Sequence, residues 1–310
     1  MIKIINNELV LSQTWSDNPH GICGHTFELI DYYMILKNHF DIIIYLTELT
    51  YEELIIAIES KYDFKLEERN DILKHIIITE QPTLLKVKNI LFVDGSLENI
   101  KNINIISDNI ITFSCGDKEA YKTKDKKFTI LQDESPTPYG KVYSPGPRTI
   151  HYKKKVLYRF KKATPKKRTL LYLTTNCRKY PIDEVKNLIY QFDKEYNREW
   201  LIATNDLNYY NILQSNKIEV LQLPIENFHD QFDNYIYTPL ERKWDCSNRL
   251  IVECRALHKN FQYYLPDDYL SHDKALLVRR FDLEQNKVQL KENDEIIGIL
   301  DEVINSNSYS

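Results

Sequence analysis

Short apolar runs alternate with longer segments of helical spacing along the first half of the chain. The apolar runs read "MIKIIN", "DIIIYL", "HIIIT", "NILFVDG", "INIIS" and "NIITFS", and the helical segments begin at Thr26 and Thr50 and lie near Leu84. Continuous Ile, Val and Leu strands between amphipathic helices are typical of a parallel sheet that is buried on both faces. The pattern therefore predicts an α/β fold for this half.

The same alternation begins again at residue 169. Strands are predicted over "TLLYLTT", "EWLIAT", "IEVLQL", "NYIYTP" and "FQYYLP", with helices at 181–196, near Tyr209, near Phe228 and at 247–258. We therefore expect two Rossmann-like α/β domains that face a central cleft, with ligands bound at the carboxyl ends of the strands. The predicted parts are an N-terminal domain at 1–150, a basic linker at 151–168 and a C-terminal domain at 169–310.

The composition is that of a globular protein without a membrane span. Of the 310 residues, 43% are hydrophobic and 28% are charged, and the apolar runs are too short to cross a bilayer. The N-terminus lacks the long apolar core and the cleavage site of a signal peptide. Seven residues are glycine, while Ile, Asn, Lys and Tyr are abundant, as in the AT-rich genomes of many phages. We expect a cytoplasmic protein, in the host cell if a phage encodes it.

Positive charge is concentrated in the segment "HYKKKVLYRFKKATPKKR", residues 151–168. It holds nine Lys and Arg residues and no acid, so the net charge of -4 leaves -4 - 9 = -13 on the rest of the chain. Such a run is either a solvated linker or a surface that contacts phosphate groups. Its predicted contacts with DNA are made by Lys153, Lys154, Lys161 and Lys162.

Two of the glycines, Gly21 and Gly24, stand between the first strand and the first helix in "SDNPHGICGHTFELIDYYMIL". Glycine lets the backbone approach a ligand, and the start of a helix offers N–H groups to an anion. The spacing is Gly-x-x-Gly rather than the dinucleotide motif Gly-x-Gly-x-x-Gly, so a tight strand-to-helix turn is the alternative. His20, His25 and Glu28 lie beside these glycines and are candidates for contact with a sugar or nucleotide.

Asp94 ends the most apolar strand of the first half, "NILFVDGS". A carboxylate at the carboxyl end of a strand is placed to take a proton from an acceptor hydroxyl, so Asp94 is the predicted general base. A helix N-cap or a turn residue has the same sequence signature. In that case the catalytic base is sought among His20, His25 and Glu28.

A third group of candidates lies in "RKWDCSNRLIVECRALHK", residues 242–259. Helix-starting residues followed by arginine present N–H groups, a hydroxyl and a guanidinium to phosphates. Arg249 and Glu253 are four residues apart, so an ion pair on one helical face is the alternative. The predicted nucleotide-binding residues here are Asp245, Ser247, Asn248, Arg249 and Glu253, joined by Arg178 and Lys179 after the first strand of the second half.

These features together resemble the two-Rossmann-domain (GT-B) glycosyltransferases, and "GICGHTFELIDYYMILKNHFDIIIYL" resembles the glycine-loop segment of the phage DNA α-glucosyltransferases. The resemblance implies that Gly21 and Gly24 approach the donor phosphate and that Asp94 serves the acceptor. It also implies that Arg178 and Lys179 hold the diphosphate. An acid on a later helix binds ribose in that family, a role that falls to Glu253. The two glutamates of the retaining families, which have seven residues between them, appear here as Asp245 and Glu253.

The expected function is therefore sugar transfer from a nucleotide sugar, with a UDP-sugar as donor, to an acceptor hydroxyl. The chain has no Asp-x-Asp motif, so we expect transfer without a metal or other cofactor, with Arg, Lys and helix dipoles neutralising the diphosphate. The acceptor is either a modified base in phage DNA or a glycan or small molecule. The alternative class is a non-catalytic module that binds nucleotides or sugars. The absence of Gly-x-Gly-x-x-Gly argues against an oxidoreductase.

The five cysteines are scattered and form no Cys-x-x-Cys pair. An odd number of scattered cysteines argues against a disulfide framework and against a zinc site. We therefore predict reduced thiols and no bound metal.

Overall fold

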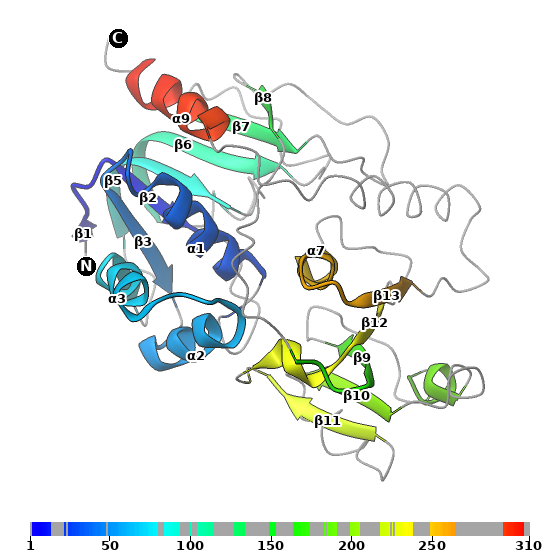
Figure 1. The fold of residues 1–310 in the computed structure, drawn as a ribbon. Coiled ribbons are helices and arrows are strands. Elements are labelled where there is room, and N and C mark those ends of the chain that lie inside the picture. Colours follow the sequence, from blue (N-terminus) through cyan, green and yellow to red (C-terminus); the bar gives the residue numbers. More distant parts are fainter. Residues whose placement is uncertain are drawn as a thin grey trace. The chain divides into compact units, whose positions relative to one another are not determined.

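The protein, seen here in a computed structural model, folds into two compact units (Figure 1). The first unit comprises Met1–Tyr51, Phe64–Leu157 and Gln289–Ser310, and the second comprises Glu52–Asp63 and Tyr158–Val288. The boundary after residue 157 falls inside the basic segment 151–168. The structure describes residues 2–13, 22, 24–47, 49–79, 84–93, 100, 104–114, 127–133, 149–152, 164–173, 183, 185–190, 199–204, 218–223, 225, 227–237, 249–263 and 294–306.

The first unit contains an eight-stranded parallel sheet. Its strands are β1 (Ile2–Ile4), β2 (Leu9–Ser12), β3 (Ile42–Thr47), β4 (Ile76–Thr79), β5 (Leu84–Phe92), β6 (Ile105–Ser114), β7 (Phe128–Asp133) and β8 (Thr149–Tyr152). The strand order is β4-β3-β2-β5-β6-β7-β8, and β1 pairs with the beginning of β5. The helices are α1 (Gly24–Leu36), α3 (Leu66–Lys74) and α9 (Asp294–Ser306).

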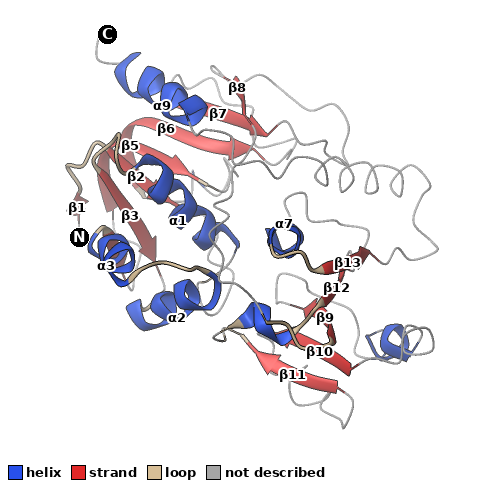
Figure 2. Ribbon diagram, in the orientation of Figure 1, coloured by secondary structure: helices blue, strands red, loops and turns tan. Residues whose placement is uncertain are grey.

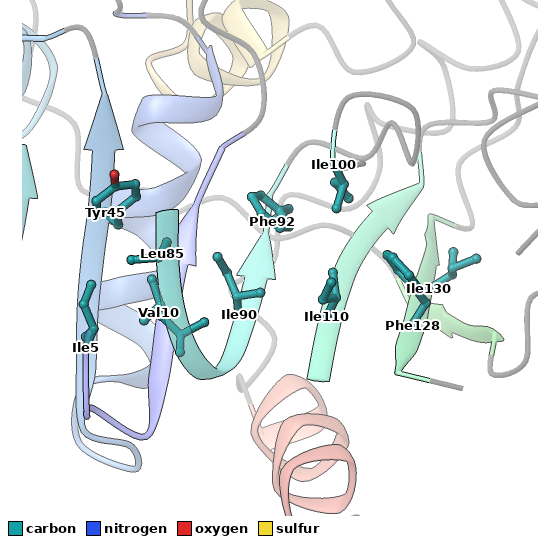
Figure 3. Packing of buried hydrophobic residues seen from close by; sticks show 11 residues of the cluster. Ile5, Val10, Tyr45, Leu85, Ile90, Phe92, Ile100, Ile110, Phe128 and Ile130 are labelled. Atoms are coloured by element: carbon teal, nitrogen blue, oxygen red, sulfur yellow. The ribbon is translucent and has the colours of Figure 1, made fainter. Parts of the chain in front are cut away.

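One face of this sheet is closed by a row of apolar side chains in register. Val10 pairs with Ile90, Ile90 with Ile110, and Ile110 with Phe128, so all four project from the same face of a parallel sheet. Figure 3 shows these side chains lying across neighbouring strands. The alternate residues Leu9 and Leu11 are also fully buried, which confirms the prediction of a sheet covered on both faces.

Helix α1 is buried almost all round, including the carboxylate residues Glu28 and Asp31. The C-terminal end of α1 is hydrogen-bonded to α3. Asp71 on α3 accepts hydrogen bonds from the Tyr33 hydroxyl at 3.1 Å and from Lys37 Nζ at 2.7 Å. Burial, followed by the Asp71 charge, raises the pKa of Tyr33. Burial also acts to raise the pKa of Asp71, but Lys37 and Tyr33 together lower it below its ordinary value. This network fixes the helix that begins at the predicted glycine loop.

Three details of the predicted strand pattern in this unit are wrong. The segment near Leu84 is not a helix but the start of β5, because Leu85 and Val87 are buried while Lys86 and Lys88 are exposed, a period of two. "INIIS" and "NIITFS" are one continuous strand, β6, paired along the length of β5. The N-terminal run gives only the short β1, and the central strand β2 follows it.

The second unit contains a five-stranded parallel sheet of order β11-β10-β9-β12-β13. The strands are β9 (Arg168–Leu173), β10 (Glu199–Thr204), β11 (Ile218–Gln222), β12 (Asn234–Tyr237) and β13 (Asn260–Tyr263). The 3-10 helix η2 (Phe228–Gln231) precedes β12, and α7 (Arg249–Ala256) follows it. Helix α2 (Tyr51–Lys61) also belongs here from residue 52 onward, although the N-terminal half of the chain encodes it.

Successive residues of β9 supply the two hydrophobic cores of this unit. Leu170 lies in register with Leu201 and Tyr235 and packs with Phe232 on one face. Leu171, the next residue, lies in register with Ile202 and Ile236 in a separate cluster. The strands and the helical segments at 185–190, 228–231 and 249–256 confirm those predicted for the second half, within a few residues at their ends. The predicted helix near Tyr209 lies outside the described residues.

Both sheets have the strand order of a Rossmann-like fold, as predicted (Figure 2). The chain lays β3 and β4 on one side of β2 and then returns to place β5 on the other side. In the second unit it lays β10 and β11 on one side of β9 and returns to place β12 on the other. The order reverses between β2 and β5 and again between β9 and β12. Ligands of open parallel sheets bind outside the carboxyl ends of strands at such points.

Candidate functional site

The predicted site residues all follow one of the four strands that flank the reversal points. Gly21, Gly24, His25 and Glu28 come after β2, and Asp94 comes after β5. In the second unit, Arg178 and Lys179 come after β9, and Asp245, Ser247, Asn248, Arg249 and Glu253 come after β12. The carboxyl ends of parallel strands meet at one edge of their sheet. The topology is therefore compatible with a ligand site at these strand ends, and the place of the individual candidates there stays a prediction.

Only part of this set lies among the described residues. The structure describes Gly24, His25, Glu28 and Glu253, and it describes Arg249 as the first residue of α7. The remaining predicted residues lie outside the described part of the chain: His20, Gly21, Asp94, Arg178, Lys179, Asp245, Ser247, Asn248, Lys153, Lys154, Lys161 and Lys162. Their roles stay predictions.

Gly24 is the first residue of α1, and its backbone is outside the left-handed region. No described atom lies within 4 Å of the position that a Cβ would occupy there. Neither backbone conformation nor contact with a described residue therefore demands glycine at this position. The observation leaves close approach of a ligand as a reason for the glycine.

His25 and Glu28 form a pair on the first turn of α1. The distance from His25 Nδ1 to Glu28 Oε2 is 3.0 Å, and the side chains are 24% and 7% exposed. An ionised carboxylate can only accept a hydrogen bond, so Nδ1 donates the proton in this contact. Glu28 thus orients the imidazole ring of His25.

Hydrogen bonds fix the carboxyl ends of the neighbouring strands. Ser12 Oγ at the end of β2 donates to the carbonyl of Tyr45 on β3 at 3.0 Å, and Val93 N donates to the Ser12 carbonyl at 3.1 Å. Thr26 Oγ1 on α1 donates to Gln13 Oε1 at 3.1 Å. These bonds tie β2, β3, the end of β5 and the start of α1 into one rigid edge. A binding group at this edge is held in place before its ligand arrives.

The second unit contains a buried charged cluster around Glu253. The Glu253 side chain is 0% exposed, and Lys61 Nζ on α2 donates to both carboxylate oxygens at 2.9 Å. His229 Nε2 lies 3.2 Å from Glu253 Oε2. Burial lowers the pKa of His229, opposed by the Glu253 carboxylate and assisted by the charges of Lys61 and Lys259. His229 is therefore neutral at pH 7, and Lys61 neutralises Glu253.

Lys259 lies next to this cluster and contacts the backbone on either side of it. Its ammonium donates to the carbonyls of His229 and Phe232, both at 2.6 Å, and lies 4.5 Å from the centre of the Phe232 ring. Burial lowers the pKa of Lys259. Peptide carbonyls and an aromatic face both attract a cation, so Lys259 fastens η2, the short helix that carries His229.

The comparisons with known proteins give no family. No family model and no curated protein sequence matches the chain. Among solved structures, UDP-N-acetylglucosamine 2-epimerase from Rickettsia bellii is similar, with 12% sequence identity, a TM-score of 0.44, and coverage of 96% of this chain and 96% of that chain. A likeness of this size carries no argument about function. Within the described part of the chain, no helix is long and apolar enough to cross a membrane.

Sequence reasoning missed Lys61, His229 and Lys259. Lys61 and Glu253 are 192 positions apart, and α2 gives no local signal that it packs in the second unit. The predicted alternative for Glu253 was an ion pair with Arg249, four positions earlier. The structure shows a fully buried Glu253 carboxylate bound by Lys61, while the pair with Arg249 and the contact of Glu253 with ribose stay predictions.

Proposed function

We propose that the protein is a glycosyltransferase that moves a sugar from a UDP-sugar to an acceptor hydroxyl without a metal ion. The observation that supports this proposal is the strand order of the two sheets, because the predicted phosphate-binding residues follow, in the sequence, the strands beside the two reversal points. A sheet order alone is shared by many functions, so the argument rests on residue chemistry. Helix-starting residues and arginines suit a diphosphate, and a carboxylate suits an attacking hydroxyl.

The second unit takes the donor in this proposal. Arg178 and Lys179 after β9, with Ser247, Asn248 and Arg249 around the start of α7, bind the diphosphate. Their positive charges and N–H groups stabilise the negative charge that develops as the nucleotide departs. Asp245 precedes this helix start and orders the turn. Because these groups supply the charge themselves, the transfer needs no metal.

The first unit takes the acceptor. Asp94, after β5, removes the proton from the attacking hydroxyl, while Gly21 and Gly24 let the backbone approach the donor phosphate. The alternative general base is His25 together with Glu28, supported by the 3.0 Å contact between their side chains on the first turn of α1. In the sequence both sets follow a strand beside the β2–β5 reversal point, which supports the proposal that they serve the same acceptor.

For the acceptor we propose a modified base in phage DNA, supported by the nine cations of residues 151–168 and by the resemblance of the glycine loop. Lys153, Lys154, Lys161 and Lys162 contact the phosphate backbone. A glycan or small-molecule acceptor does not require these contacts.

The alternative of a non-catalytic binding module is separated by turnover. We expect UDP to raise the melting temperature, since a ligand at 100 times its Kd stabilises by about 2.7 kcal/mol. We also expect slow release of UDP from UDP-glucose alone and faster release with DNA that carries 5-hydroxymethylcytosine. Binding without any UDP release across a panel of UDP-sugars and acceptors identifies a module, and the absence of UDP binding overturns the proposed function.

A further inference from the structure

Glu253 carries a charge that the fold has removed from water. Its side chain is 0% exposed, and both of its oxygens lie 2.9 Å from Lys61 Nζ. A buried carboxylate is costly unless a cation and further hydrogen bonds compensate it, and removal of one partner leaves the other uncompensated. The compensating cation comes from α2, so a helix encoded in the N-terminal half completes the second unit.

The cluster lies toward the amino ends of the strands. His229 precedes β12 and Lys259 directly precedes β13, and these two strands are parallel neighbours. Helix α7 connects the carboxyl end of β12 to the amino end of β13, so it runs from the ligand edge of the sheet to the opposite edge. Glu253 is four residues into α7 from Arg249, about 6 Å along the helix axis at 1.5 Å per residue.

We propose that Glu253 is a buried counter-charge and that Lys61 is a positioning residue for the nucleotide site. The inference rests on the proposed function. Lys61 from α2 and His229 from η2 both contact Glu253, one turn after the start of α7, and so hold α7 against α2 and η2. These contacts thereby fix the first turn of α7, at the helix start that the proposed function assigns to the diphosphate.

This role competes with ribose binding by the same carboxylate. A ribose ligand offers its oxygens to two hydroxyl groups of the nucleotide, but both Glu253 oxygens are bound to Lys61. The Lys61 side chain is only 14% exposed, so little water could solvate the Glu253 carboxylate if the lysine moved away. Each oxygen can accept a second hydrogen bond, but the side chain of Glu253 is 0% exposed, so contact with ribose requires the packing around Glu253 to open, whereas the positioning role uses the ion pair as it stands.

The experiment compares Lys61→Met, Glu253→Gln and the double variant Lys61→Met/Glu253→Gln by melting temperature. Breaking a buried pair from one side is expected to lower the Tm of each single variant by roughly 6 to 20 °C. The double variant leaves no unpaired buried charge, so most of that loss is expected to return. Lys74→Met makes the same chemical change at an exposed position on α3 and is expected to leave the Tm unchanged within about 2 °C.

The second readout is the affinity for UDP and for 2′-deoxy-UDP by calorimetry. We expect the single variants to bind UDP about 3- to 30-fold more weakly, with affinity largely restored in the double variant and the preference for UDP over 2′-deoxy-UDP unchanged throughout. Loss of that preference in both variants that lack Glu253 shows a ribose ligand and overturns the inference.

The outcomes also separate this inference from the proposed function. If the wild-type protein binds no UDP, the nucleotide site fails and the positioning role fails with it. The melting temperatures still decide whether Glu253 is a counter-charge, because they need no ligand. If the loss of Tm in the double variant equals the sum of the losses in the two single variants, Lys61 and Glu253 are not coupled, and the role of Glu253 as a counter-charge is overturned.

Discussion

At the residue scale, the first unit offers two different groups as the base for the acceptor hydroxyl. Asp94 follows the β5 strand, whose last residues Ile90, Leu91 and Phe92 are fully buried. His25 stands on the first turn of α1 with its ring oriented by Glu28. A carboxylate and a histidine are both suitable general bases. Kinetics of conservative variants distinguish them.

We predict that Asp94→Asn lowers turnover by about 100- to 10,000-fold, the usual contribution of a positioned base. The amide keeps the size of the side chain but cannot take up the proton, so UDP affinity and Tm are expected to stay near the wild-type values. The measurement is UDP release in the presence of acceptor. Glu28→Gln is the matched variant, and it is expected to lose less turnover. A large loss in Glu28→Gln with full activity in Asp94→Asn assigns the base to His25.

At the scale of the elements, local pattern predicted most strands and helices, because apolar periodicity is a local property. It failed at the start of β5, where Lys86 and Lys88 alternate with Leu85 and Val87 and the segment was taken for a helix, although it pairs with β1 and β6. It also missed β7, β8 and α9, which the sequence reading left unassigned. The candidate residues after the strands could be proposed because strand ends are visible in the sequence, and their roles stay predictions. The Lys61–Glu253 pair was not, because it depends on where α2 packs.

The contacts between η2, α7 and α2 also make the second unit sensitive to pH. His229 on η2 faces Glu253 from α7, Lys61 from α2 and Lys259 before β13. Burial lowers the pKa of His229 in the folded chain below its ordinary value. The unfolded chain therefore takes up this proton at a higher pH, and stability that is present above the ordinary pKa of about 6.5 is lost as the pH falls below it.

We predict that His229→Gln flattens the pH dependence of unfolding between pH 7.5 and pH 5. One proton changes the free energy of unfolding by at most about 1.4 kcal/mol per pH unit, which urea titrations at several pH values resolve. Lys61→Met is expected to flatten the same slope, because loss of the lysine charge and retention of Glu253 favour protonated His229. A slope in His229→Gln equal to that of the wild type places the titrating group elsewhere.

At the scale of the whole molecule, charge is distributed unevenly along the chain. Residues 151–168 carry nine positive charges. Since the net charge of the chain is -4, the remaining residues carry a net charge of -13. A uniformly acidic protein is repelled by DNA, so any contact with DNA phosphates must be local, and this segment is where the sequence concentrates the cations.

We predict that replacing Lys153, Lys154, Lys161 and Lys162 by glutamine weakens DNA binding and flattens its salt dependence. Each lost phosphate contact is expected to reduce the slope of log K against log salt concentration by about 0.9 for duplex DNA. UDP affinity is expected to stay constant, because the donor is bound by residues after β9 and β12, and constant UDP affinity also shows that the variant is folded. Fluorescence anisotropy with a labelled duplex across several salt concentrations measures the slope. If the wild-type protein fails to bind the duplex at low salt, the segment is a linker, and the acceptor is to be sought among glycans and small molecules.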